Sequence, residues 1–220
     1  MSLTCRACVA AAPKPGRWAS VLTLSLGLAL AACSPPQPLS EQELVDSASS
    51  QFESRSFSVA VLNYQELLEQ FPFSDHAQTA RLKIAHAYYL AGKYENAIAA
   101  FNDFERLHPT SRDLPFVEYT VAMCHFDQSL KADRDSSSTQ RALRHFERLL
   151  ARYPNSVYGR LATYRIAQSK ERLARHELNV ADFYRESGRN EAAQARYRFI
   201  IEHYPDTRTA LKVAGRLGKS

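Results

Sequence analysis

Apolar residues recur at spacings of three and four along most of the chain after residue 40, the pattern of helices that bury one face. Polar stretches and prolines separate these runs into pairs. The pattern predicts helix pairs near 41–54 and 57–70, 74–91 and 94–107, 112–131 and 139–152, and 156–187 and 190–203. A last periodic segment, 208–218, predicts a single closing helix. We therefore expect an all-α protein.

A short string with proline closes each expected pair. Every copy has an aromatic residue or histidine, then proline, any residue, and serine or threonine. Proline ends the preceding helix, because it lacks an N–H donor and disfavours helical geometry one residue earlier, and the hydroxyl residue can cap the next helix. The copies are Phe71-Pro72-Phe73-Ser74, His108-Pro109-Thr110-Ser111, Tyr153-Pro154-Asn155-Ser156 and Tyr204-Pro205-Asp206-Thr207.

The same residue types precede each proline at fixed distances. An alanine stands twelve residues before it, an aromatic residue eight before it and a large apolar residue five before it, on one helical face. In two units a glycine stands seventeen residues before the proline, where a turn between the paired helices would need it. These positions are Ala60, Ala97, Ala142 and Ala193, then Tyr64, Phe101, Phe146 and Tyr197, then Leu67, Phe104, Leu149 and Ile200, with Gly92 and Gly188.

The arrangement resembles the tetratricopeptide repeat. The resemblance implies a superhelix of about four helix pairs plus a capping helix, with units near 41–72, 74–109, 111–154 and 156–205 and a cap at 207–218. The prolines lie 37, 45 and 51 residues apart, against ~34 for a standard unit, so the third and fourth units are the longest. We expect a polar loop at 131–138 to take up the excess in the third unit, and an unusually long first helix, 156–187, to do so in the fourth.

The first 32 residues form a pattern typical of an export signal. Three basic residues and no acidic one precede an apolar run that ends in Leu30-Ala31-Ala32-Cys33. The run is short for a membrane span of ~20 residues, and the pattern resembles the signal of bacterial lipoproteins, in which the cysteine is acylated. We predict a signal peptide at 1–32, lipid on Cys33, a proline-rich tether at 33–40 and a repeat domain at 41–220. An ordinary secretory signal is the alternative.

Charge is divided between the two halves of the exported chain. Residues 34–138 hold 8 Lys and Arg against 15 Asp and Glu, whereas residues 139–220 hold 17 against 8. An exported lipoprotein meets no nucleic acid, so the arginines are expected to meet carboxylates of a protein partner or to be solvated. Cys124 is the only cysteine left after export and lipidation, and we expect it in the core and not as a nucleophile.

The sequence holds no convincing catalytic or metal-binding motif. Asp133, Asp135 and Ser137 alternate like the start of a calcium loop, but the required glycine and distal glutamate are missing. None of the seven histidines forms a zinc-hydrolase pair. We therefore expect a binding protein that is not an enzyme and holds no cofactor apart from the lipid on Cys33.

Two aromatic residues lie off the repeat positions, next to unit boundaries. Phe73 and Phe116 are interpreted as lining a groove for an extended peptide, and the alternative is packing between repeats.

Longer stretches carry a more specific resemblance. They are the run from Glu66 to Ser74, Asp133-Arg134-Asp135, Arg152-Tyr153-Pro154-Asn155-Ser156-x-Tyr158, and Arg172-Leu173-Ala174-x-x-Glu177-x-x-Val180-Ala181-x-Phe183-Tyr184. In this order they resemble the BamD family, lipoproteins of the outer-membrane β-barrel assembly machine. The resemblance implies an outer-membrane location on the periplasmic face, and partners comprising the periplasmic domains of a BamA-like insertase, other assembly-machine lipoproteins and unfolded β-barrel substrates.

The resemblance also carries one site residue. The stretch from Ala195 to Thr207 matches the second helix of the family's fourth unit, and Arg196 falls where an arginine faces the insertase. The family commonly has a fifth helix pair, and here a single expected helix follows unit four, so docking is expected to depend more on that unit. Alternatives are a pilotin-like lipoprotein for secretin assembly, or an accessory protein of cell-wall enzymes.

Overall fold

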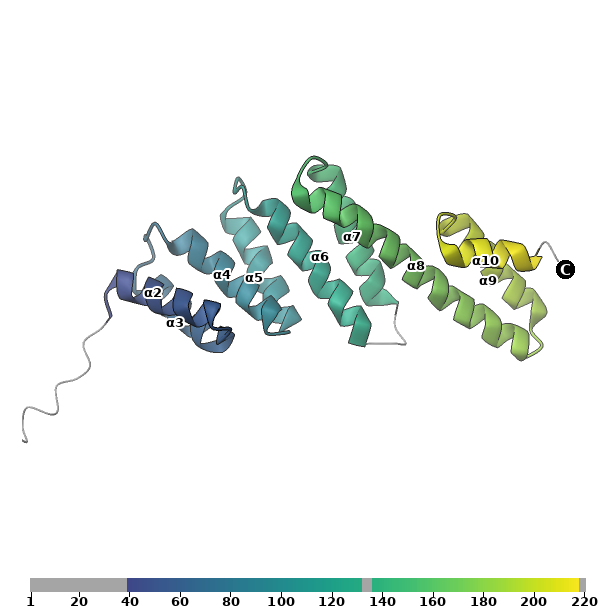
Figure 1. Ribbon diagram of the computed structural model, residues 1–220, viewed down its shortest axis with the longest axis horizontal. Coiled ribbons are helices and arrows are strands. Elements are labelled where there is room, and N and C mark those ends of the chain that lie inside the picture. The colour runs from purple at the N-terminus through teal and green to yellow at the C-terminus, as the bar shows by residue number, and fades with distance from the viewer. Residues whose placement is uncertain (1–38, 132–135, 218–220) are drawn as a thin grey trace, which may run out of the picture. The chain divides into compact units, whose positions relative to one another are not determined.

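The computed structural model describes residues 39–131 and 136–217, and every regular element within them is a helix (Figure 1). The expected all-α class is therefore confirmed. The expected signal peptide, Cys33, the expected tether up to residue 38, Asp133 and Asp135 lie outside the described residues. The helices are α2 (Glu41–Glu53), α3 (Phe57–Gln70), α4 (Ala77–Leu90), α5 (Tyr94–Leu107), α6 (Leu114–Lys131), α7 (Ser137–Arg152), α8 (Val157–Glu186), α9 (Asn190–His203) and α10 (Arg208–Leu217).

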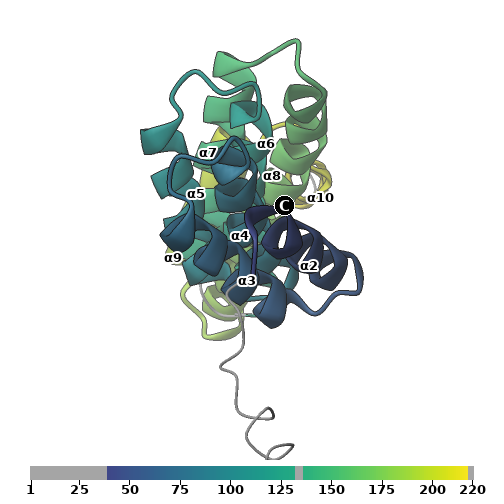
Figure 2. The same ribbon diagram turned by 90° about the vertical axis from the view of Figure 1, so that its left-hand side faces the viewer.

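The helices of unit 40–220 pack as successive pairs in chain order. α2 packs on α3, α4 on α5, α6 on α7 and α8 on α9, and α10 closes the series against α8 and α9. Each pair also contacts the next, so the pairs form one continuous stack of the kind expected for tetratricopeptide repeats (Figure 1). In the view of Figure 2 the second helices α5, α7 and α9 lie toward one side, and α8 and the closing helix α10 lie toward the other.

The repeat positions form the core, as the sequence predicts. The alanines twelve residues before each proline, the aromatic residues eight before and the large apolar residues five before are all buried. The small alanine lets a neighbouring helix approach closely, and the larger side chains fill the space on either side. Cys124 belongs to the same core and is fully buried, as expected.

Glycine sets the turns inside two pairs. Gly92 and Gly188 have φ values of +72° and +75°, a left-handed conformation that side chains other than glycine rarely adopt. Each lies between the first and second helix of its unit, where the sequence predicts a turn.

Serine and threonine begin the following helices in two different ways. The hydroxyls of Ser156 and Thr207 accept from the N–H groups of Gly159 (2.9 Å) and Ala210 (3.1 Å), and thus cap α8 and α10 as predicted. The hydroxyl of Ser74 instead accepts from the N–H group of His76 and donates to Glu41. Because this hydroxyl closes a turn ahead of the helix, α4 begins at Ala77 and not at residue 74.

The third unit differs from its prediction at both helix starts, since α6 begins at Leu114 and not at residue 112, and α7 begins before residue 139. The polar segment 131–138 was expected to be a loop, but α7 already begins at Ser137. Ser138 and Thr139 are buried in the stack, so tertiary packing, and not local composition, places these polar residues in the first turn of α7.

The fourth unit has the long first helix that its length predicts. α8 has 30 residues and contacts α6, α7, α9 and α10. Within residues 39–131 and 136–217, none of the helices combines the length and apolar composition needed to cross a bilayer.

Candidate functional site

A continuous series of aromatic contacts crosses the first helices of the four units. The Phe52 ring of α2 lies 5.6 Å from His86 of α4, which lies 5.2 Å from Phe116 of α6, which in turn lies 5.6 Å from Tyr158 of α8. We call these four residues the aromatic track. Tyr119 extends it, with its ring 5.5 Å from Tyr158. Side chains at these distances interact favourably, and the track joins all four units.

A pocket opens in the middle of the aromatic track. His86, Phe116 and Tyr158 contribute rings, and charged groups stand beside them. The full lining is Leu82, Lys83, His86, Arg112, Asp113, Phe116 and Tyr158. Burial, followed by the nearby Lys83 ammonium, lowers the pKa of His86, so its ring is neutral at pH 7. The pocket thus offers aromatic surface next to two cationic side chains, Lys83 and Arg112, and one carboxylate, Asp113.

The structure separates the two aromatic residues chosen from the sequence. Phe116 both lines this pocket and packs on Phe101, at 6.0 Å between ring centroids, so it fits the groove interpretation and the packing alternative together. Phe73 is 99% exposed in the turn between α3 and α4, and it is not part of the aromatic track. The two side chains do not form one site.

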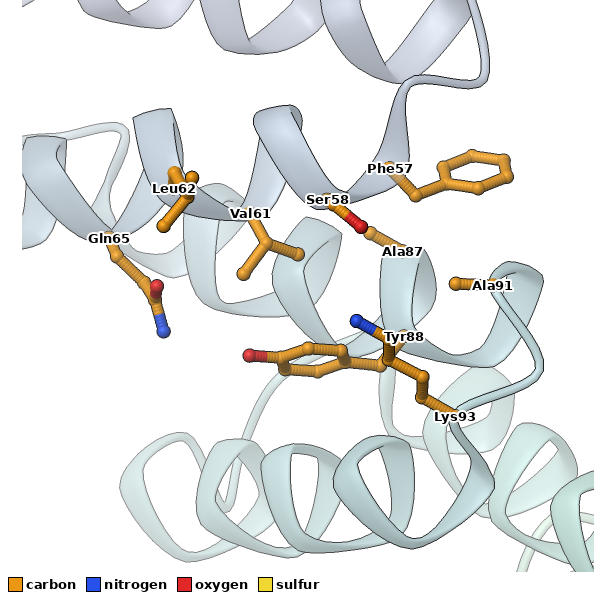
Figure 3. Close-up of a pocket in the computed structure, with 9 residues that line it drawn as sticks. All are labelled: Phe57, Ser58, Val61, Leu62, Gln65, Ala87, Tyr88, Ala91 and Lys93. Atoms are coloured by element: carbon orange, nitrogen blue, oxygen red, sulfur yellow. The ribbon is translucent and has the colours of Figure 1, made fainter.

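A second pocket lies between α3 and α4 and reaches the start of α5 (Figure 3). Val61 and Leu62 of α3 face the Tyr88 ring across it, and the Lys93 amine stands near that ring. Its lining is Phe57, Ser58, Val61, Leu62, Gln65, Ala87, Tyr88, Ala91 and Lys93. No local sequence pattern predicts this pocket, because its lining comes from α3, from α4 and from the turn after α4, which only the stacking of two units brings together.

Arg196 occupies a defined position on the fourth unit. Its guanidinium Nη1 donates to the Glu177 carboxylate of α8 at 2.8 Å, and the side chain remains 43% exposed. The next residue, Tyr197, donates its hydroxyl to Asp182 at 2.8 Å, and Arg216 of α10 donates to the same carboxylate at 3.0 Å. α8, α9 and α10 are thus tied together beside Arg196, whose remaining N–H groups are available to an external carboxylate.

Cys124 and two histidines are ionisable residues that lie at least partly inside the helical stack. Burial foremost, with the Asp127 carboxylate next, raises the pKa of the Cys124 thiol to about 12, so it stays protonated and is a poor nucleophile. His125 of α6 and His145 of α7 lie with ring centroids 5.2 Å apart, a pairing that their separation in sequence hides. Across the described parts of the chain, no cluster of three or more His, Cys, Asp or Glu side chains is arranged to hold a metal ion.

Comparison with known proteins places the chain in a family. Residues 38–214 match the YfiO family model, described as outer membrane lipoprotein. The outer membrane protein assembly factor BamD of Neisseria meningitidis serogroup B is 34% identical, over 86% of this chain and 78% of that protein. BamD of Pasteurella multocida is 30% identical, over 81% and 74%, and BamD of Vibrio cholerae is 29% identical, over 86% and 84%. A solved structure of MamA aligns with a TM-score of 0.42 at 16% identity, over 74% of this chain and 90% of that chain. Because the family model matches residues 38–214 and the Neisseria relative is 34% identical over most of both chains, the chain belongs to the YfiO family of outer membrane lipoproteins.

Proposed function

We propose that this protein is a lipid-anchored scaffold that assists the assembly of β-barrel proteins into the outer membrane, acting by binding and not by catalysis. The match to the family model over residues 38–214 carries the proposal, because it spans nearly the whole helical stack. Its relatives in Neisseria, Pasteurella and Vibrio are named outer membrane protein assembly factors. Repeat stacks of this kind present extended surfaces to partners, which suits the role of a scaffold.

The anchor is the lipid on Cys33. Acyl chains contribute about 0.8 kcal/mol per buried CH₂, so a cysteine carrying more than one chain holds a protein firmly on a membrane. We place the stack on the periplasmic face of the outer membrane, with the residues from 33 to 40 as its tether.

The fourth unit is the proposed contact with the periplasmic domains of a BamA-like insertase. Glu177 fixes one edge of the Arg196 guanidinium, and the exposed edge is free to pair with a carboxylate of the insertase. Arginine is suited to this contact because its planar fork can bind two oxygens at once. Other lipoproteins of the assembly machine would bind the same stack.

The aromatic track, which lies mainly on the first three units and ends at Tyr158 of the fourth, is the proposed contact with unfolded β-barrel substrates. The pocket on the aromatic track combines Phe116 and Tyr158 with Lys83 and Arg112. An extended segment with an aromatic side chain beside a carboxylate fits this chemistry. Phe73, exposed in the turn between α3 and α4, offers a further apolar contact.

Affinity purification of the tagged protein from membranes, followed by mass spectrometry, tests the proposal. We expect the barrel insertase among the recovered proteins, and a marked loss of it for Arg196→Glu, which reverses charge at the contact. The matched control is Arg198→Glu, an exposed arginine of the same helix. Recovery of secretin subunits or cell-wall hydrolases without an insertase would reject the proposal. Unchanged recovery for Arg196→Glu would reject only the assignment of that residue.

A further inference from the structure

Four arginines line one face of α7. Arg141, Arg144, Arg148 and Arg152 stand three or four residues apart, so they follow one another along the helix. All four are exposed, and the opposite face of α7 is buried in the core. We call them the arginine stripe. At 1.5 Å per residue the stripe is about 16 Å long.

Carboxylates of the chain itself hold one end of the arginine stripe. Arg152 donates to Glu105 of α5 at 2.9 Å and to the buried Glu118 of α6 at 2.6 Å, and Nε of Arg148 lies 4.0 Å from Glu118. The other end differs, since among the described residues no carboxylate forms a salt bridge with Arg144, and Arg141 donates only to a serine hydroxyl of its own helix. The described residues therefore supply carboxylates to half of the stripe.

The environment of the stripe is positive and polar. His145 lies on α7 among these arginines, and its pKa is lowered to about 4, by burial first and then by Arg148, His125 and Arg144. None of the large apolar side chains exposed in the described residues belongs to α7. A partner that binds here must therefore do so through negative charge and not through apolar contact.

The arrangement of charged residues around the stripe favours a narrow partner, such as a single helix or strand, over a flat membrane surface. Glu147 stands within the stripe on α7, pairs with Lys170 at 3.8 Å and is 48% exposed, and Glu105 borders the stripe at Arg152. A membrane surface that reached the arginines would also press its phosphates toward these carboxylates. A single acidic helix or strand can follow the line of arginines and avoid them. The pairing of Arg152 with two carboxylates shows that this face already has the geometry for such contacts.

We propose that the arginine stripe of α7 is a docking surface for an acidic segment of a partner protein, with carboxylates spaced to meet successive arginines. Arg141 and Arg144 provide the open end, and Arg148 and Arg152, already oriented by Glu118, provide the other. The surface lies on the third unit and is separate from the Arg196 contact, so neither depends on the other.

A fluorescent helical peptide with glutamate at every third or fourth position serves as the probe, and the same peptide with glutamine in place of glutamate serves as its control. The protein purified from membranes in a non-ionic detergent is titrated with each peptide at low and at physiological salt. The test variant is Arg141→Glu with Arg144→Glu, which spares Arg152 and the core. The matched variant is Arg160→Glu with Arg198→Glu, two exposed arginines on α8 and α9.

The proposal expects the test variant to bind the glutamate peptide at least about tenfold more weakly than the wild type, and the matched variant to bind within about twofold of it. The glutamine peptide should not bind measurably to the wild type or to either variant. Equal losses in the two variants would show general attraction to a basic protein and would overturn the proposal. Vesicles containing one third phosphatidylglycerol form a second arm. Binding to them that requires Arg141 and Arg144, in the absence of peptide binding, would also overturn the proposal and would assign the surface to lipid.

Discussion

Removing Arg152 should destabilise the stack far more than removing an arginine from an exposed ion pair. Glu118 is 1% exposed, and its Oε1 accepts from Arg152 at 2.6 Å, while its Oε2 has no hydrogen-bond partner. In Arg152→Ala the nearest remaining cation is Arg148, whose Nε is 4.0 Å from the carboxylate. Leaving a buried charge without its partner costs about 3–5 kcal/mol. Because Arg152 itself is half exposed, water can reach the space it leaves, and we expect the free energy of unfolding to fall by about 2–3 kcal/mol.

Urea unfolding followed by far-ultraviolet circular dichroism measures this loss, with Arg106→Ala as the matched control. Arg106 pairs with Asp103 at the same 2.9 Å that joins Arg152 to Glu105, but both partners are about two-thirds exposed. Such a pair contributes about 0–1 kcal/mol. The double variant Arg152→Ala with Glu118→Gln should recover part of the stability, since no buried charge remains. If Arg152→Ala costs no more than Arg106→Ala, the reasoning about Glu118 is wrong.

Three further predictions concern packing, backbone and pH. Ala142→Trp should lower the melting temperature, because overpacking a fully buried helix contact costs about 1–3 kcal/mol, and an unchanged value would contradict the repeat register. Gly159→Ala should destabilise α8, since a Cβ there would collide with the Tyr153 carbonyl oxygen, whereas Gly215→Ala in the open surroundings of α10 should stabilise by about 0.5–1 kcal/mol. A thermal shift assay in which Gly159→Ala raises the melting temperature, or Gly215→Ala lowers it, would refute this. The pKa of His145 is lowered to about 4 in the folded chain, so between about pH 6.5 and 4 the unfolded chain binds more protons and stability should fall with falling pH. His145→Gln should flatten that decline in melting temperature, and a parallel decline would show that other groups cause it.

The helices were predictable wherever a local signal fixes both ends. The bounds of α3, α5 and α9 agree with the prediction at both ends, because a turn precedes each helix and proline follows within two residues. The start of α4 was predicted three residues early, because the Ser74 hydroxyl closes a turn ahead of the helix and donates to Glu41 of the preceding unit. That second contact spans 33 residues, and no local pattern reveals it.

The candidate sites were less predictable than the helices, because they too depend on contacts between residues far apart in the sequence. Sequence resemblance pointed to Arg196, but its partner Glu177 lies 19 residues away on another helix. His86, Phe116 and Tyr158 meet only because three units stack. The periodicity of one helix tells which side chains face outward, but it does not tell which outward side chains of different units become neighbours.

The length of α8 has a mechanical consequence. In most repeat stacks each unit touches only its neighbours, so small rotations between units can absorb a displacement at one end. Here one rod of about 45 Å begins against α6 and α7 and ends against α9 and α10. A displacement of α9 and α10 is therefore transmitted along α8 to α6 and α7, and the C-terminal half of the stack should move as one rigid body.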